Sequence, residues 1–313
     1  MNRRRWLPRA LRALSLLFLL LVAVVLVRYA RNVDWHAVAA ALAALPPATL
    51  AAVAGLTVAS YLVYGGYDLA ARRYTGHHLS TRRVLAISLS SYAFALNLGA
   101  LLGGAGLRYR MYARSGLRNG TIGRIVAFVV ATNWLGYVAL GGVLFAAGTI
   151  AAPTGLAMSP GLLRALGVAM LAVAAAYLAA CAGWHGRTFH LRGHHFRWPS
   201  PRLGLAQVVL AALDWALMGT LLWVLLGPAY PWPLVAATLL LSAIATAVLH
   251  VPAGLGVAEA VFVAVLAGGT PEPRILAALL AWRAAYYVVP LVAAVAFYAG
   301  VEARAGAGPV SRG

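Results

Sequence analysis

The stretch VLAISLSSYAFALNLGALLGGAGL, residues 84–107, is predominantly apolar, yet glycines interrupt its second half. A helix over residues 84–98 would be about 22 Å long, because an α-helix rises about 1.5 Å per residue. The hydrocarbon core of a bilayer is about 30 Å thick, so this helix is too short to cross it. We therefore predict a re-entrant hairpin, which enters the membrane, breaks at Gly104 and Gly106, and leaves on the same side.

A second stretch, residues 234–267, has the same character. Its helix breakers are Pro252, Gly254 and Gly256. Aligned without gaps, residues 84–140 and 234–290 share 12 identities in 57 positions, and the paired glycines coincide. Three predicted spans separate the two stretches, so the second copy must be inverted relative to the first. Inverted repeats with broken helices near the bilayer midplane are typical of transporters.

The composition indicates a membrane protein. Hydrophobic residues make up 63% of the 313 residues and charged residues only 10%. Soluble domains are about 45–50% apolar and about 25% charged, which excludes a soluble enzyme, a disordered chain and a disulfide scaffold. The apolar runs are continuous rather than alternating, which excludes an outer-membrane barrel. We predict an all-α polytopic integral membrane protein whose long transmembrane helices cover 13–27, 48–71, 125–150, 160–182, 203–226 and 275–298.

We expect one transmembrane domain over residues 1–313, with the inverted repeat halves at about 48–150 and 203–300. A basic segment, residues 1–12, precedes it and a short tail, residues 301–313, follows it. With two re-entrant hairpins, 20 arginines fall on one side of the membrane and 4 on the other, whereas single crossings give 12 and 12. The positive-inside rule favours the hairpins, and it places both termini in the cytoplasm of a bacterial inner membrane.

Charged residues within the apolar segments are the candidates for function. They are Asp68, Arg108, Asp214, Glu259 and Arg283. A charge at the bilayer centre costs about 2.5–3.5 kcal/mol on insertion scales, so each one needs a reason. Arg108 and Arg110 follow the first glycine break, where free N–H groups and a guanidinium would together bind a phosphodiester. Glu259 and Asp214 would bind a cationic part of a lipid head group, or a coupling proton.

A plainer interpretation is that these charges pair with one another. Arg283 would then bind Glu259 or Asp214 and lock helices together, as buried ion pairs often do. Asp68 lies near the cytoplasmic end of its span, where a solvated acid or a partner of Arg72 explains it equally well.

Signals for other chemistries are missing from the sequence. It has no P-loop, no Ser-His-Asp pattern and no zinc-hydrolase motif. The loop histidines match no standard metal spacing, and the single cysteine, Cys181, cannot form an internal disulfide. The net charge of +19 is explained by membrane topology rather than by a nucleic acid partner. We therefore expect no cofactor, no metal and no enzymatic activity.

Three motifs point to a known family: GGAGLRYRMY at 103–112, PAGLGVAEAVF at 252–262 and WRAAYYVVP at 282–290. Together they resemble the transmembrane domain of the lysylphosphatidylglycerol synthetase/flippase family, the multiple peptide resistance factors. The resemblance covers roughly residues 50–300. It implies a domain that moves aminoacylated phospholipid between leaflets, and it implies a role in lipid movement for the five buried charges. The chain ends 13 residues after Gly300, so the resemblance implies a stand-alone form without the aminoacyl-transferase domain.

The leading expectation is a flippase-like lipid translocase whose partner is a membrane phospholipid or glycolipid. An alternative is a non-transporting accessory subunit of a lipid-synthesising enzyme. A third is an intramembrane lipid transferase with an interfacial site near Asp68, His77 and His78.

Overall fold

A computed structural model describes residues 43–149, 159–191, 194–249, 256–266 and 271–306, together with positions 36, 39, 40, 254 and 268. The helices and strands are α3 (Pro47–Thr75), α4 (Thr81–Leu98), the π-helix η1 (Ala100–Gly106), α5 (Leu107–Arg114), α6 (Asn119–Ala146), α7 (Pro160–Gly183), β1 (Thr188–Leu191), β2 (His194–Arg197), α8 (Pro201–Leu226), α9 (Trp232–Leu249), α10 (Val257–Leu266), α11 (Glu272–Trp282), the π-helix η3 (Arg283–Val288) and α12 (Val289–Gly306). The predicted all-α fold is confirmed, apart from the short antiparallel hairpin β1–β2 in a predicted polar loop.

Six of the described helices are long and apolar enough to cross a membrane. Five of them, namely α3, α6, α7, α8 and the continuous helix α11–η3–α12, coincide with predicted spans. The sixth is α9, which the sequence assigns to the second hairpin. With 18 residues α9 is about 27 Å long, close to the thickness of a hydrocarbon core. The predicted first span, 13–27, lies outside the described residues.

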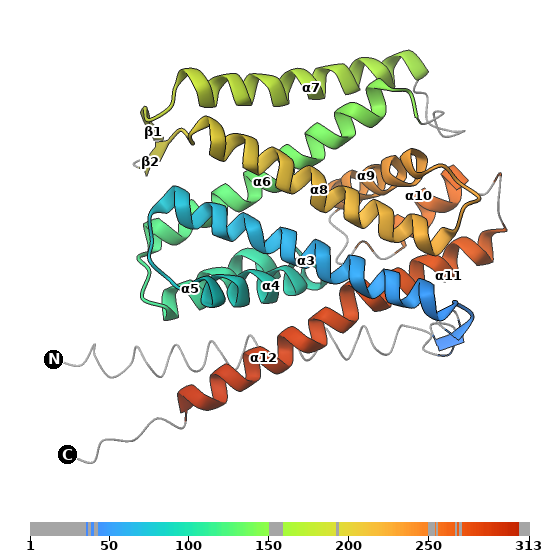
Figure 1. The fold of residues 1–313 in the computed structure, drawn as a ribbon, viewed down its shortest axis with the longest axis horizontal. Helices are drawn as coiled ribbons and strands as arrows, with labels where there is room; N and C mark the ends of the chain where they lie inside the picture. Colours follow the sequence, from blue (N-terminus) through green and yellow to red (C-terminus); the bar gives the residue numbers. More distant parts are fainter. Residues whose placement is uncertain are drawn as a thin grey trace.

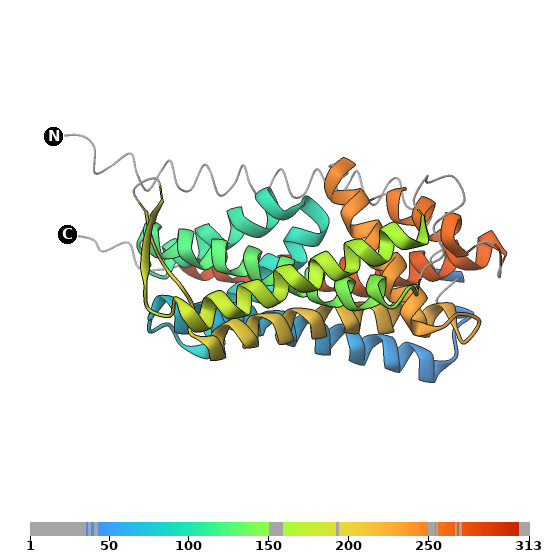
Figure 2. The ribbon, with the colours of Figure 1, turned by 90° about the horizontal axis from the view of Figure 1, so that it is seen from above.

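The long helices form a bundle in which α3 lies beside α8 near the centre (Figure 1). Helix α6 packs against both α7 and α8, while α12 packs against α4. Figure 2 shows that the bundle is elongated along one axis, which most helices follow. One main core of buried apolar residues fills the space between α3, α4, α8 and α11. This core is where the candidate residues of the sequence meet.

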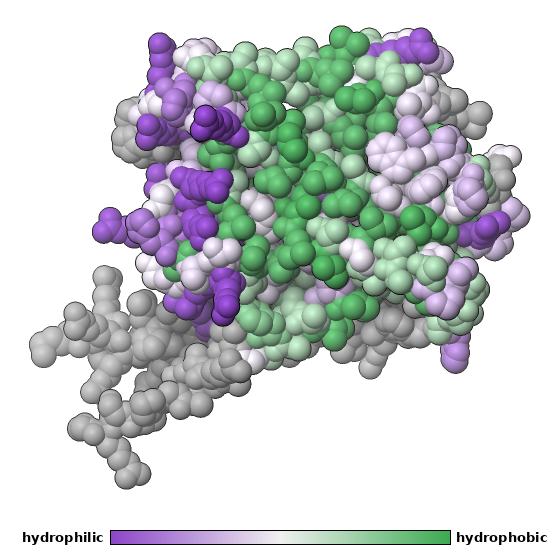
Figure 3. Space-filling view, viewed as in Figure 1, coloured by the Kyte–Doolittle hydropathy of each residue, from purple (hydrophilic) through white to green (hydrophobic). Residues whose placement is uncertain are grey.

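The outer surface is banded in the way a membrane requires. Figure 3 shows a broad apolar band across the molecule, with hydrophilic residues gathered mainly at one end. Apolar side chains of the band are exposed, for example Val58 at 58% and Val168 at 60%. At the hydrophilic end, arginines occupy the last turns of α3 and α5 and the first turns of α4 and α8. These surfaces fit lipid around the middle and water at the arginine-rich end.

Helices α4 and α5 form a hairpin, with both outer ends at the arginine-rich end of the bundle (Figure 1). The chain reverses at Gly99, whose φ of 85° lies in the left-handed region that favours glycine. The returning segment then packs so closely on α4 that a Cβ at Gly103 would lie 2.1 Å from the carbonyl oxygen of Phe94. The glycines of this stretch therefore serve both the turn and a close contact between helices.

The prediction that this hairpin breaks at Gly104 and Gly106 is wrong. Both residues lie inside η1, and Gly106 has helical φ and ψ of −63° and −51°. The break comes earlier, because the residues after Gly99 wind into a wide π-helix that continues directly into α5. In the sequence, a run of small residues that pack closely resembles a run of helix breakers.

The second hairpin, α9 and α10, has its outer ends at the opposite end of the bundle (Figure 1). Two glycines lie between these helices with left-handed φ, Gly254 at 60° and Gly256 at 78°. A Cβ at Gly254 would lie 2.7 Å from Oγ1 of Thr246. Pro252 lies outside the described residues. Re-entry of the two hairpins into a bilayer, and their relation as an inverted repeat, stay predictions.

Candidate functional site

The first ion pair joins Arg108, at the start of α5, to Asp68 of α3. The guanidinium binds in a bidentate manner, because Nε and Nη2 each lie 3.1 Å from a different carboxylate oxygen. The side chains of Arg108 and Asp68 are 4% and 0% exposed. Tyr112 and Ser88 donate two more hydrogen bonds to the same carboxylate, at 2.9 and 2.6 Å. The charge of Asp68 is therefore fully solvated by protein groups.

Neither predicted environment of Asp68 is correct. Asp68 is buried rather than solvated, and Arg72 does not bind it. Arg72 donates instead to the carbonyl of Leu79 and to Oγ1 of Thr81, at 3.0 and 3.1 Å. The reason is that Arg72 lies in the last turn of α3, where its guanidinium reaches the following loop, while Asp68 lies one turn deeper.

The predicted anion site at Arg108 also differs from the structure. Because η1 runs into α5 without a break, the N–H of Leu107 bonds to the carbonyl of Gly104 and is not free. The first hydrogen bond of the returning helix runs from Gly103 to Gly99, so its open N-terminus lies at η1. The guanidinium fork of Arg108 is occupied by Asp68. A phosphate that binds the Nε–Nη2 edge of Arg108 must displace that carboxylate.

The second ion pair joins Arg283, the first residue of η3, to Glu259 of α10. It too is bidentate, with Nε 2.7 Å and Nη2 3.0 Å from the two carboxylate oxygens. Nη2 also donates to the carbonyl of Gly254, at 3.0 Å. The side chain of Arg283 is 4% exposed and that of Glu259 is 22% exposed. This is one of the two pairings that the sequence leaves open for Arg283.

Asp214 of α8 has a different environment. Its carboxylate accepts hydrogen bonds from Ser60 at 2.5 Å and from Tyr67 at 3.2 Å, both on α3. Asp214, Ser60 and Tyr67 are all 0% exposed. Among the described residues, Arg108 pairs with Asp68 and Arg283 pairs with Glu259, so neither arginine pairs with Asp214. The alternative pairing of Arg283 with Asp214 is therefore wrong.

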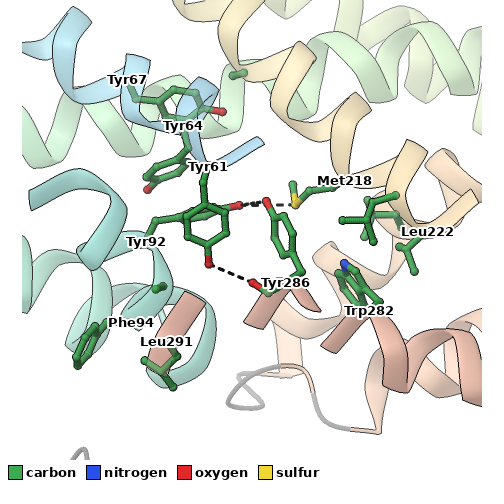
Figure 4. Packing of buried hydrophobic residues seen from close by; sticks show 14 of the residues in the cluster. Tyr61, Tyr64, Tyr67, Tyr92, Phe94, Met218, Leu222, Trp282, Tyr286 and Leu291 are labelled. Atoms are coloured by element: carbon green, nitrogen blue, oxygen red, sulfur yellow. Dashed lines mark hydrogen bonds between the residues drawn. The ribbon is translucent and has the colours of Figure 1, made fainter. Parts of the chain in front are cut away.

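A row of hydroxyls continues from Asp214 across the core. The Ser60 hydroxyl lies 2.6 Å from that of Tyr286 in η3, which in turn lies 2.9 Å from that of Tyr92 in α4. Figure 4 shows Tyr92 and Tyr286 with their hydroxyls directed at each other, next to Met218. We call Asp214, Ser60, Tyr67, Tyr286 and Tyr92 the polar seam. The seam lies between the first predicted half, which holds α3 and α4, and the second, which holds α8 and η3.

Tyrosines also connect the polar seam to the first ion pair. The ring of Tyr64 stacks on that of Tyr92, with ring centroids 3.7 Å apart. The Tyr64 hydroxyl accepts a hydrogen bond from Arg108 at 3.4 Å. Our sequence prediction missed these tyrosines, although Tyr61, Tyr64 and Tyr67 recur at the three-residue spacing that places side chains on one face of a helix.

Arg110 does not join the first ion pair. Its guanidinium lies over the ring of Tyr298 in α12, 6.0 Å from the centroid, whereas Arg108 faces α3. Two residues along a helix turn the side chain by about 200°, so the two arginines point away from each other. Among the loop candidates, His77 packs edge-on against Tyr112 at 5.8 Å between ring centroids. Burial and the neighbouring Arg72 lower the pKa of His77 below its ordinary value.

Comparison with known proteins gives one family and two relatives. The model of the family described as lysylphosphatidylglycerol synthase TM region matches residues 13–294. The inner membrane protein YbhN of Escherichia coli is 42% identical over 302 residues, which cover 96% of this chain and 95% of that protein. The uncharacterized protein slr0712 of Synechocystis is 30% identical over 264 residues, which cover 82% and 80% of the two chains.

Proposed function

The chain is a membrane protein that belongs to the family of the lysylphosphatidylglycerol synthase TM region, and on this premise we propose that it is a lipid translocase. Its substrate is a phospholipid or a related glycolipid, which it moves between the leaflets of a bacterial inner membrane. It carries out no covalent chemistry on that lipid.

The observation that carries the proposal is the presence of two bidentate guanidinium–carboxylate pairs in the core of a membrane protein. A phosphodiester offers a guanidinium the same two-oxygen geometry as a carboxylate does. A lipid phosphate can therefore exchange with Glu259 or Asp68 without leaving the arginine uncompensated. Such exchange is a way to move an anionic group through a medium in which an isolated charge costs several kcal/mol.

The second ion pair is the better entry point, because Glu259 is partly exposed while Asp68 is not. In the proposed cycle the phosphate takes the place of Glu259 on Arg283, and the acyl chains stay in the surrounding lipid. The first ion pair then opens as the two halves move against each other, and Arg108 receives the phosphate. Alternating access of this kind is the usual mode of transporters with paired broken helices.

The proposal includes a topology. We propose that the arginine-rich end of the bundle faces the cytoplasm and that both termini lie on that side, as the positive-inside rule favours. The α4–α5 hairpin then enters from the cytoplasmic face and the α9–α10 hairpin enters from the opposite face. The two ion pairs belong to opposite hairpins, so each lies on the path from one leaflet.

The test is reconstitution of the purified protein into liposomes that contain fluorescent phospholipid, glycolipid or polyprenyl lipid. Quenching of the outer leaflet by a membrane-impermeant reductant reports the movement of each probe. We expect one lipid class to move faster than in empty vesicles, and we expect Glu259→Gln combined with Arg283→Gln to abolish the gain. Arg202→Gln, at an exposed arginine outside the site, is the matched control. Movement no faster than in empty vesicles for every probe would overturn the proposal.

A further inference from the structure

Asp214 is a buried acid with hydroxyl partners. Asp68 and Glu259 each bind an arginine in a bidentate manner, whereas the hydrogen bonds of Asp214 come from Ser60 and Tyr67. A carboxylate in a membrane interior without a cation costs several kcal/mol, and two neutral donors offset only part of that cost. The arrangement therefore favours a cation that binds Asp214 directly.

The packing around Asp214 restricts what that cation can be. Asp214, Ser60, Tyr67 and Tyr286 are each 0% exposed. A head-group amine or a metal ion needs volume and several ligands, and protein interiors are close-packed. A proton needs no volume, because it binds one carboxylate oxygen and becomes the hydrogen of an ordinary hydrogen bond.

The hydroxyls of the polar seam provide a path for that proton. When Asp214 is ionised, Tyr92 donates to Tyr286, Tyr286 donates to Ser60, and Ser60 donates to Asp214. A proton delivered to the Tyr92 oxygen displaces its hydrogen to Tyr286, and two further transfers along the row protonate Asp214. Each O–H bond that breaks is replaced by one that forms, so every hydroxyl keeps one hydrogen.

After Asp214 is protonated, each hydrogen bond in the row of hydroxyls has its donor and acceptor exchanged. Protonated Asp214 donates to Ser60, Ser60 donates to Tyr286, and Tyr286 donates to Tyr92. The geometry permits both directions, since in the contacts of Tyr286 with Ser60 and with Tyr92 either oxygen can be the donor. Among the described residues, the sulfur of Met218 lies 3.6 Å from the Tyr92 hydroxyl, within reach as a weak acceptor.

We propose that Asp214 is a proton-binding site, loaded through the hydroxyls of Ser60, Tyr286 and Tyr92, and that its protonation controls the contact between the two halves. The control follows from the location of the seam, because Asp214 and Tyr286 belong to the second half and the other members to the first. Ionised Asp214 accepts hydrogen bonds from two donors of α3 at once. Protonated Asp214 donates to Ser60 and accepts from Tyr67, so both contacts across the halves lose their negative charge and weaken. The link to lipid movement rests on the proposed translocase function.

Other titratable groups do not replace this role. The tyrosines that face Asp214 come from three elements and are Tyr61, Tyr64 and Tyr67 of α3, Tyr92 of α4, and Tyr286 of η3. Helix α9 carries no ionisable residue. In α6, α7 and α11, which also pack against α8, the charged residues lie near the N-terminal ends, whereas Asp214 lies in the middle of α8.

The direct test is infrared difference spectroscopy of the purified full-length protein during a pH titration. A protonated carboxyl has a carbonyl band that disappears on ionisation. We expect such a band in the wild type and in Tyr137→Phe, which removes a buried hydroxyl bonded to a main-chain carbonyl outside the seam. We expect its loss in Asp214→Asn, which keeps the shape of the side chain. A band that persists unchanged in Asp214→Asn would overturn the proposal.

A second variant covers the case in which Asp214→Asn does not fold. Ser60→Ala removes the shortest hydrogen bond to the carboxyl while keeping the acid, so we expect the band to shift in frequency. An unshifted band would show that the titrating carboxyl is not Asp214.

Liposomes with an imposed pH gradient test the coupling. We expect lipid movement by the wild type and by Tyr137→Phe to respond to the gradient, and movement by Asp214→Asn to be independent of it. Movement that is indifferent to pH in the wild type contradicts the coupling while leaving the translocase intact. A titrating Asp214 band without lipid movement contradicts the translocase while leaving the proton site intact.

Discussion

The two ion pairs have the same guanidinium–carboxylate geometry but differ in how completely the protein encloses them. Asp68 accepts hydrogen bonds from Arg108, Tyr112 and Ser88 and has no exposed surface. Glu259 is partly exposed, and among the described residues its carboxylate accepts hydrogen bonds from Arg283. A carboxylate that the protein solvates on every side is stable but slow to exchange. In the proposed cycle the lipid phosphate therefore enters at the second ion pair, whose carboxylate is partly exposed, while the first ion pair is closed to it in this conformation.

The largest effect is expected when one member of the first ion pair is removed. Asp68→Ala leaves a buried guanidinium without a counterion and should destabilise the protein by about 3–5 kcal/mol. Thermal unfolding in detergent, followed by circular dichroism, measures the loss. Replacing both members, with Asp68→Leu and Arg108→Met, should recover part of the stability, because no charge is then left unpaired. If Asp68→Ala is as stable as the wild type, the first ion pair is not the more firmly enclosed of the two.

The next effect concerns the backbone that holds the first ion pair in place. Gly103→Ala puts a Cβ against the main chain of Phe94, which cannot move as a side chain can, and should cost about 1–3 kcal/mol. Gly106→Ala is the matched control, because the nearest atom to its Cβ is 3.5 Å away and its φ is helical. Unfolding midpoints of the two variants check the difference. Equal destabilisation would contradict the close approach of η1 to α4.

A smaller loss of stability is expected at the second ion pair. Glu259→Gln replaces a charge-assisted contact at a partly exposed site and should cost about 1.5 kcal/mol, the low end for such bonds. Lipid movement should nevertheless be strongly reduced, since in the proposed cycle a phosphate takes the place of Glu259 on Arg283. Parallel unfolding and liposome assays on the same preparation measure both. If Glu259→Gln costs as much stability as Asp68→Asn, the two pairs do not differ in the way described.

The smallest effect is expected at the link between the first ion pair and the polar seam. The bond from Arg108 to the Tyr64 hydroxyl is long, at 3.4 Å, and the stacking of Tyr64 on Tyr92 does not need the hydroxyl. Tyr64→Phe should therefore cost about 0.5 kcal/mol. Tyr112→Phe is the informative partner variant, because it removes a 2.9 Å bond to Asp68 and should cost more. The reverse order in unfolding experiments would show that Tyr64 is the stronger support of the pair.

The sequence predicted the membrane fold and the buried charges for the same physical reason. Long apolar runs must cross a bilayer, and a charge inside them is too expensive to be accidental. Pairing was harder to predict, because it depends on how the helices are rotated and packed. Asp68 lies 40 residues from Arg108 in sequence, and no local pattern shows that α3 and α5 face each other.

The turn and the tyrosines were missed for related reasons. A π-helix has no pattern of its own in the sequence, so the glycines of η1 resembled a break rather than a close contact. Tyr92 and Tyr286 lie 194 residues apart, and they form one hydrogen-bonded row only when the two halves are assembled.

The two π-helices determine the direction in which the side chains of Arg108 and Arg283 point from their helices. η1 ends just before α5, which begins one residue ahead of Arg108, and η3 begins at Arg283. Each residue advances an α-helix by about 100°. If one of these π-helices became α-helical, the side chains that follow it would rotate about the helix axis by a comparable angle. Rewinding η1 in this way would turn Arg108 away from Asp68 without any hinge outside the helix.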